Sequence, residues 1–290
     1  VTGVQTCALP ILLYHRLWRR FGATYVMPTV CAATHDAAYR ATFGSMESAD
    51  PRDVVHAQLV VVWGANPAVS NTHFLPLVAE ARRRGARVVV VDPRRTDLVR
   101  MPHIEAQYHL ALRPGTNAAI LNALAHVIVT EGLVNEKFVR EFCDRSAFEH
   151  WAAFVSEPQN SPEAVAKVSG VPAETIRGAA RLYATGGNGA IYYGLGVTEH
   201  SQGTTAVMGI ANLAMVTGNL GRQGVGVNPL RGQNNVQGSC DMGSFPHEFS
   251  GYRHVSDDSV RAVFEEAWHI GLKGDPGDRK STRLNSSHRT

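Results

Sequence analysis

Three continuous apolar runs in the sequence are each followed directly by glycine or polar residues. Gly64 and Asn66 follow the first run, Asp92 and Arg94 follow the second, and Gly196 follows the third. Such runs are typical of parallel strands buried on both faces, and ligands of these sheets bind beyond the carboxyl ends of the strands. Amides and backbone N–H groups suit phosphates and polar rings, an acidic residue suits ribose hydroxyls, and arginine suits phosphate. The pattern therefore predicts a ligand that contains a nucleotide.

The glycines do not form the fingerprint of nicotinamide-binding enzymes. Gly194 and Gly196 are followed by Glu199 where the third glycine would fall, and no Gly-x-Gly follows the first run. This spacing disfavours a nicotinamide-dependent dehydrogenase. A simpler interpretation also stays open, because Asp92 could form a turn with Pro93 without binding a ligand.

Cys31 lies in the segment TVCAATHDAAY, near the start of an expected helix. A helix N-terminus lowers the pKa of a thiol, and the thiolate is both a nucleophile and a soft metal ligand. His35 lies four residues further on, but a single Cys/His pair is not a metal site by itself. The alternative is a buried and inert cysteine, which is how we interpret Cys143 and Cys240.

Arg231 lies in an irregular polar segment, 225–252, that is rich in Gly, Asn and Gln. Long segments of this type often carry function. Glycines surround Arg231 and no acidic residue lies close to it in sequence, so a small anion has access to it. A buried arginine needs an anionic partner, because an unpaired buried charge is costly. An anionic ligand and a remote carboxylate are equally open as that partner.

Strands that alternate with helices predict an α/β fold with a doubly wound, mostly parallel sheet. The expected strands are the apolar runs at 59–63, 87–91 and 190–193, and the loops at 64–67 and 194–196 end two of them. Helical periodicity or helix start and stop signals predict helices at 12–21, 37–41, 71–84, 116–131, 135–142, 162–168, 172–183 and 204–216.

The two ends of the chain have an unusual relationship. Residues 1–11 read VTGVQTCALPI and residues 278–288 read DRKSTRLNSSH. One double-stranded DNA sequence, translated from its two strands, encodes both segments, and it resembles a sequencing adapter. We therefore interpret residues 1–11 and 278–290 as translated adapter and exclude them from the fold. The expected native sequence is an internal fragment, residues 12–277.

The composition is that of a globular protein, with 44% hydrophobic and 18% charged residues. It excludes disordered, collagen-like and disulfide-dense classes, and no apolar run reaches the roughly 18–20 residues that span a bilayer. The formal net charge is +3, but segment 278–290 holds four basic residues and one acidic residue, which account for the whole excess. The neutral remainder gives no reason to expect nucleic acid or a membrane as a partner.

One segment carries a specific resemblance. PLRGQNNVQGSCDMG at 229–243, preceded by AMVTGNLGRQGVGVNP, closely resembles the catalytic alpha subunit of molybdenum- or tungsten-dependent formate dehydrogenases, in the molybdopterin oxidoreductase family. VVWGANP, VVVVDPRR, LRPGTNAAILNALAHVI and YYGLGVTEHSQGT are similar to the wider family. The resemblance implies an enzyme that oxidises formate to CO2 with a bis-molybdopterin guanine dinucleotide (bis-MGD) that carries Mo or W.

The resemblance also implies a domain division within the formate dehydrogenase/DMSO reductase fold. Residues 12–27 would end a preceding α/β domain, 28–231 would form a Rossmann-like cofactor-binding domain, and 232–277 would begin the return into the preceding domain. A 4Fe-4S cluster is expected in the missing N-terminal part, with electron-transfer subunits as partners. The compartment is left open, with the cytoplasm favoured over the periplasm.

Site residues follow from the resemblance position by position. Cys31 matches the cysteine or selenocysteine that ligates the metal, Arg231 matches the arginine that orients formate, and Gln233 matches a second polar residue of the active site. The residues that fall in cofactor-binding segments are Gly64, Asn66, Asp92, Arg94, Gly115, Asn117, Gly196 and Thr198.

The sequence departs from the formate dehydrogenase pattern at Ala32, where the family typically has a histidine that handles the formate proton or hydride. GANPAVSNTH at 64–73 is also more similar to other branches of the family. Another bis-MGD enzyme, such as a nitrate or sulfur-oxyanion reductase, is therefore an alternative. A non-catalytic subunit of the same fold, as in respiratory complex I, is a further alternative that Cys31 and Arg231 oppose.

Overall fold

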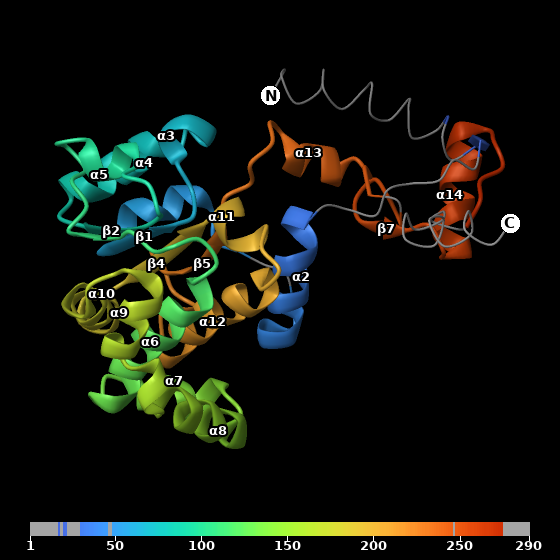
Figure 1. Cartoon of the computed structure of the whole chain (residues 1–290). Helices are drawn as coiled ribbons and strands as arrows, with labels where there is room; N and C mark the ends of the chain where they lie inside the picture. The colour runs from blue at the N-terminus through green and yellow to red at the C-terminus, as the bar shows by residue number, and fades with distance from the viewer. Residues whose placement is uncertain (1–16, 18–19, 22–29, 46–47, 246, 275–290) are drawn as a thin grey trace, which may run out of the picture. The chain divides into compact units, whose positions relative to one another are not determined.

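The structure is a computed structural model that describes residues 17, 20–21, 30–45, 48–245 and 247–274 (Figure 1). The adapter-like ends and most of the expected helix at 12–21 lie outside the described residues. The chain forms two compact units. The sheet unit is Val30–Gly232, and the second unit combines Gln233–Thr290 with Val1–Thr29.

Five parallel strands form the sheet unit's centre, in the order β3-β2-β1-β4-β5. The chain winds outward from β1 to β3 and then returns to the other side of β1, so the winding direction reverses between β1 and β4. Such a reversal is the point where sheets of this kind bind ligands. The strands are β1 Leu59–Trp63, β2 Arg87–Val91, β3 Tyr108–Leu110, β4 Gly189–Tyr193 and β5 Gly226–Pro229.

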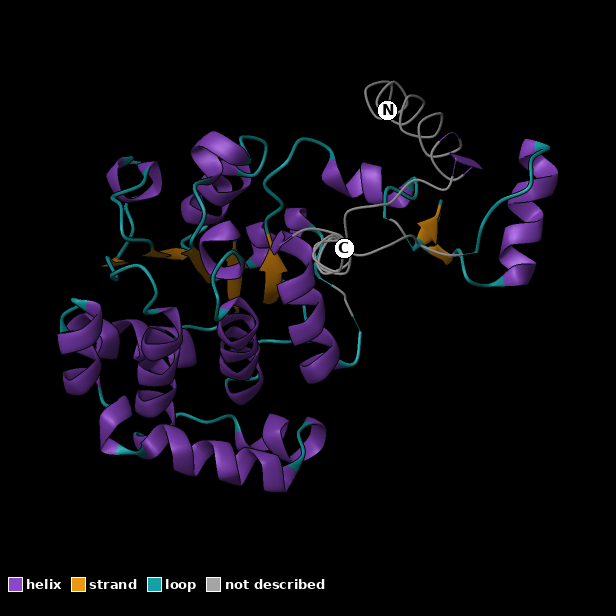
Figure 2. Ribbon diagram, turned by 45° about the vertical axis from the view of Figure 1, so that its right-hand side comes forward, coloured by secondary structure: helices purple, strands orange, loops and turns teal. Residues whose placement is uncertain are grey.

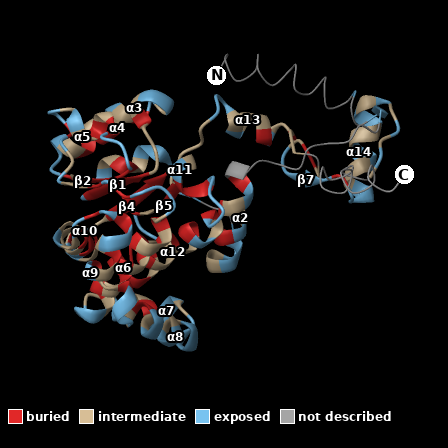
Figure 3. Cartoon of the chain, in the orientation of Figure 1, coloured by how far each residue is buried: buried red, intermediate tan, exposed pale blue. Residues whose placement is uncertain are grey.

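The central strands are buried on both faces, as their unbroken apolar sequences predict. Leu59, Val61 and Trp63 of β1 belong to one hydrophobic cluster, and Val60 and Val62 belong to another on the opposite face. This alternation follows from the two-residue period of a strand. Buried residues are concentrated in the strands and on the helix faces that cover them (Figure 3).

Helices cover the sheet on both sides (Figure 2). One face carries α2 Val30–Phe43, α6 Asn117–Thr130, α10 Ala173–Thr185 and α12 Gly203–Val216, whose apolar residues share a cluster with β1. The other face carries η1 Pro51–His56, α4 Leu75–Arg83 and α5 Asp97–Arg100. The remaining helices of the unit are α3 Pro67–Ser70, α7 Glu136–Phe142, α8 Arg145–Ser156, η2 Pro158–Asn160, α9 Pro162–Ser169 and α11 Leu195–Thr198.

The predicted doubly wound parallel α/β fold is confirmed, but several boundaries were wrong. The helix expected at 71–84 begins only at Leu75, and Pro67, expected in a loop, begins α3. Both helices start at or one residue before a proline, which occupies the first turn without loss of a hydrogen bond. The segment expected to be irregular, 225–252, contains β5, which adds to the edge of β4 despite its Gly and Pro.

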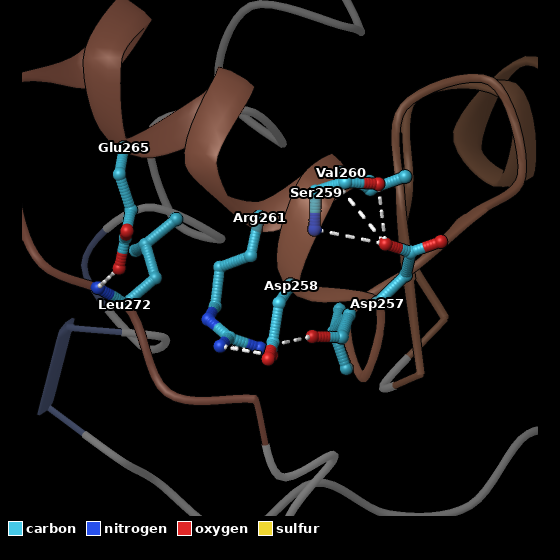
Figure 4. A network of polar contacts seen from close by, with 8 residues as sticks. Asp257, Asp258, Ser259, Val260, Arg261, Glu265 and Leu272 are labelled. Carbon is cyan, nitrogen blue, oxygen red and sulfur yellow. Dashed lines mark hydrogen bonds and ion pairs between the residues drawn. The ribbon is translucent and has the colours of Figure 1, made fainter.

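The second unit contains α13 Val236–Asp241, the antiparallel pair β6 Glu248–Phe249 and β7 Arg253–His254, and α14 Asp258–Trp268. Asp257 caps α14 by accepting hydrogen bonds from the backbone N–H groups of Ser259 and Val260, at 2.9 and 3.2 Å (Figure 4). The Ser259 hydroxyl also donates to this carboxylate, at 2.6 Å, and together with the two backbone bonds it holds the pKa of Asp257 below its usual value. The Phe249 ring stacks on Phe264 with centroids 4.3 Å apart, which packs β6 against α14. In the described part of the chain, no helix has the length and apolar character needed to cross a membrane.

Candidate functional site

The loops after four strands of the sheet line a cavity of about 360 Å³, which we call the nucleotide-sized cavity. It lies at the carboxyl ends of β1, β2 and β4, where the winding direction reverses, and extends to the loop after β3. Six of the predicted cofactor residues line it: Gly64, Asn66, Asp92, Arg94, Asn117 and Gly196. Gly115 lies beside it in the exposed turn after Pro114, and Thr198 lines a different pocket.

Gly64 and Gly196 bring the loops after β1 and β4 into direct contact. The Gly196 N–H donates a hydrogen bond to the Gly64 carbonyl at 3.0 Å. A Cβ on Gly64 would lie 2.7 Å from the carbonyl carbon of Gly196, and Gly64 also has a φ of +56°. Neither the close approach nor this φ suits a side chain, so glycine is required where the two loops meet.

Asn66 presents an unsatisfied acceptor. Its Nδ2 donates to Asp97 Oδ2 at 3.3 Å, and because a carboxylate only accepts, this contact sets the orientation of the amide. Asn66 Oδ1 is then buried without a hydrogen-bond partner among the described residues. A buried acceptor on a cavity wall is satisfied by a ligand N–H or O–H group, so the residues present fit a ligand with pterin, guanine or ribose donors.

Asp92 forms a turn with the residues that follow it, which is the simpler interpretation of its place in the sequence. Its Oδ1 accepts from the Arg94 N–H at 2.8 Å, and its backbone carbonyl lies 2.9 Å from His109 Nε2. Asp92 is 7% exposed, whereas Arg94 and Arg95 are exposed. Asp92 therefore shapes the loop after β2, and the exposed arginines are accessible to a phosphate.

The Asn117 amide bonds within the protein. Its Oδ1 accepts from Trp63 Nε1 at 2.7 Å, and its Nδ2 donates to the Gly196 carbonyl at 3.4 Å. These bonds join the end of β1 to the start of α6 and to the turn after β4. Asn117 thus holds Gly196 in place, although it also lines the cavity.

A second, smaller pocket lies at the ends of β4 and β5. Arg231, His35 and Thr198 line it together with residues at the ends of β4 and β5. Asn71 Nδ2 donates to the Arg231 carbonyl at 3.1 Å and so ties the loop after β5 to the segment before α4. The structure therefore brings the predicted substrate arginine next to the nucleotide-sized cavity, with the short helix α11 between them.

The start of α2 supplies the predicted metal ligand. Cys31 is the second residue of α2, one helical turn before His35, and its side chain lies outside what the structure describes. His35 is 2% exposed, and its ring stands edge-on to Tyr39. Gln233 is exposed and belongs to the second unit. No group of three or more His, Cys, Asp or Glu suited to a metal ion occurs among the described residues.

Two buried tyrosines, Tyr39 of α2 and Tyr193 of β4, lie near one another, and Tyr193 lines the smaller pocket. Burial raises the pKa of Tyr39 and Tyr193 far above the usual value, so both phenols stay neutral. Tyr39 donates its hydroxyl proton to the Val227 carbonyl at 2.5 Å, which joins α2 to β5. Together these contacts fix α2 against the strand that leads to Arg231.

Sequence reasoning missed Asp97 and His200. His200 lines the cavity but follows α11 in a segment without periodicity. Asp97 acts on the cavity only through Asn66, a relationship that spacing in sequence does not reveal.

The comparisons with known proteins agree with this geometry. The model of the molybdopterin oxidoreductase family matches residues 7–284. The chain belongs to the molybdopterin oxidoreductase family.

Members of the family with curated names include formate dehydrogenases. Formate dehydrogenase H of Escherichia coli K12 is 42% identical over 227 residues, which are 78% of this chain and 30% of that protein. The alpha subunit of F420-dependent formate dehydrogenase 2 of Methanococcus maripaludis is 40% identical over 216 residues, 74% of this chain and 30% of that protein. The chain thus spans about three tenths of the length of these relatives.

Other branches of the family are similar as well. The assimilatory nitrate reductase catalytic subunit of Bacillus subtilis is 28% identical over 243 residues, 83% of this chain and 33% of that protein. Among solved structures, acetylene hydratase from Pelobacter acetylenicus superposes with a TM-score of 0.58 at 27% identity, over 66% of this chain and 25% of that chain. Family membership implies a molybdopterin cofactor, and the chain is consistent with a molybdopterin-dependent oxidoreductase.

Proposed function

We propose that this chain is the cofactor-binding part of a formate dehydrogenase that uses bis-MGD with Mo or W. The proposal rests on one observation: the nucleotide-sized cavity and the pocket that contains Arg231 adjoin at α11. Gly196 lines the nucleotide-sized cavity, and Thr198, two residues later, lines the pocket that holds Arg231. A dinucleotide cofactor in the first site would thus have its reactive end close to an anion in the second.

The cavity residues would hold the cofactor by complementary contacts. Asn66 Oδ1 would accept from a ligand N–H or O–H group, and Arg94 would pair with a phosphate. Gly64 and Gly196 would let the cofactor approach the backbone closely, as glycines do in other dinucleotide sites. When bound, the cofactor would supply a metal centre that can accept two electrons. The Cys31 thiolate would help to hold that metal.

Arg231 would hold the substrate. A charge-assisted hydrogen bond from its guanidinium to formate contributes about 1.5–3 kcal/mol, which is enough to orient a one-carbon anion. Oxidation of formate yields CO2, one proton and two electrons. The electrons would leave through a 4Fe-4S cluster in the N-terminal part of the full-length protein and then through electron-transfer subunits.

Nitrate reduction is the second candidate. Ala32, 8% exposed, stands where formate dehydrogenases typically have histidine, and a nitrate reductase subunit is among the relatives. Nitrate is a small planar anion like formate, so the Arg231 pocket would suit either substrate.

The two candidates are separated by assays of the full-length protein. We expect formate-dependent reduction of a dye that is lost in Arg231→Ala and kept in Arg140→Ala, which removes an exposed arginine of α7. Reduction of nitrate by a reduced dye, without formate oxidation, would contradict formate as the substrate.

A further inference from the structure

We propose that the Thr198 hydroxyl donates a hydrogen bond to one oxygen of the small anion that Arg231 holds, and so selects the substrate. The inference rests on the proposed function, in which an oxyanion is the substrate. It assigns Thr198 to the substrate pocket, whereas the family resemblance placed it among the cofactor residues.

The buried position of the Thr198 hydroxyl supports this role. Thr198 is 3% exposed, and its Oγ1 has no hydrogen-bond partner among the described residues. A buried hydroxyl without a partner costs stability that a valine of the same shape would not. The Thr198 hydroxyl is therefore available to donate to a ligand in the pocket that it lines.

The α11 turn places Thr198 on the lining of the pocket that contains Arg231. Residues two positions apart point to nearly opposite sides of a helical turn. Gly196 lines the nucleotide-sized cavity, and Thr198 instead lines the pocket shared by His35 and Arg231. Thr198 thus faces the predicted substrate arginine and not the nucleotide.

The size of the pocket also suits an oxygen of a small anion. Its volume is about 10 Å³, close to the smallest space that admits one water molecule. One oxygen of a carboxylate fits there and accepts a hydrogen bond from Thr198. A methyl group in the same place would leave the Thr198 hydroxyl without a partner. A donor hydroxyl and a guanidinium at one pocket suit an anion with two oxygens, such as formate.

The test compares Thr198→Val, Thr198→Ser and the matched control Thr96→Val in the full-length holoenzyme. Thr96 is also buried, with an unpartnered hydroxyl, but lines neither pocket. We expect Thr198→Val to raise the KM for formate by about tenfold to a hundredfold, as loss of a hydrogen bond to a charged group does. Thr198→Ser should restore the KM, and Thr96→Val should leave it unchanged.

Two readouts separate this role from others. Metal and pterin content per protein should be unchanged in Thr198→Val, and formate should raise its unfolding temperature less than that of the wild type. A fall in cofactor content, or an unchanged KM, would overturn the proposal. If the wild type reduces nitrate instead of oxidising formate, the proposed function fails, and the same KM comparison with nitrate decides the role of Thr198.

Discussion

The Gly196 N–H donates to the Gly64 carbonyl at 3.0 Å, across the point where the winding of the sheet reverses. The bond joins the loops that follow β1 and β4. At this part of the cavity wall, the backbones of the two loops are therefore in direct contact. Asn117 reinforces this contact from α6, since it bonds both Trp63 and the Gly196 carbonyl. The geometry of the cavity therefore depends on a few buried polar contacts.

Gly64→Ala should destabilise the full-length protein and lower its cofactor content. The new Cβ would meet the carbonyl carbon of Gly196 at 2.7 Å, in addition to the strain of a φ of +56°. We expect a loss of about 1–3 kcal/mol. Gly85→Ala is the control, because Gly85 has a φ of +96° with no heavy atom within 4 Å of an added Cβ. Equal unfolding temperatures for the two variants would contradict the close-contact argument.

Asn117→Leu should cost about 1–3 kcal/mol, because it leaves the buried Trp63 Nε1–H without an acceptor. Trp63→Phe has no N–H to satisfy, so Asn117→Leu should cost less in that background than in the wild type. Thermal unfolding measures the single and double variants. An equal cost of Asn117→Leu in both backgrounds would show that the Trp63 bond does not support the end of β1.

Asp97→Ala should lower cofactor affinity about threefold to tenfold, since the Asn66 amide is then free to turn its Nδ2 toward the cavity. Arg100 is the other partner of the Asp97 carboxylate, at 2.8 Å, so Arg100→Ala is the matched control and should retain cofactor. The measurement is metal and pterin content after dialysis. Equal retention in Asp97→Ala and in the wild type would exclude a positioning role for Asp97.

The Glu131–Arg181 pair predicts a pH effect on stability. Arg181 donates two hydrogen bonds to the carboxylate, at 2.7 and 2.9 Å, and this lowers the pKa of Glu131 in the folded protein. Its contribution is therefore complete above the ordinary glutamate pKa near 4.5 and is lost as the pH falls through the lower, folded-state pKa. Glu131→Gln should show a smaller fall in unfolding temperature on acidification than the wild type. Parallel pH profiles would exclude the pair as a source of acid sensitivity.

The sequence was most informative where one local pattern decides the structure. LVVVW and RVVVV predict β1 and β2 with their observed bounds, because strands buried on both faces have unbroken apolar runs. β5 could not be predicted in this way, since GVNP has no apolar run and becomes a strand only by pairing with β4.

The site shows the same limit. Gly64, Asn66 and Asp92 were predicted to lie together because all parallel strands end at one edge, and they do. The pocket that Thr198 faces depends on the direction of the α11 turn, and Asp97 acts through Asn66, so both relationships arise only from tertiary structure.

The central claim, that the strand-end cavity holds a guanine dinucleotide cofactor beside a formate pocket, is tested most directly by analysis of the purified full-length protein. Acid release of nucleotide, with metal analysis of the same sample, should yield guanine nucleotide together with Mo or W, and both should decline in Gly64→Ala. A protein that oxidises formate without guanine nucleotide, or that keeps its full nucleotide content in Gly64→Ala, would contradict the account.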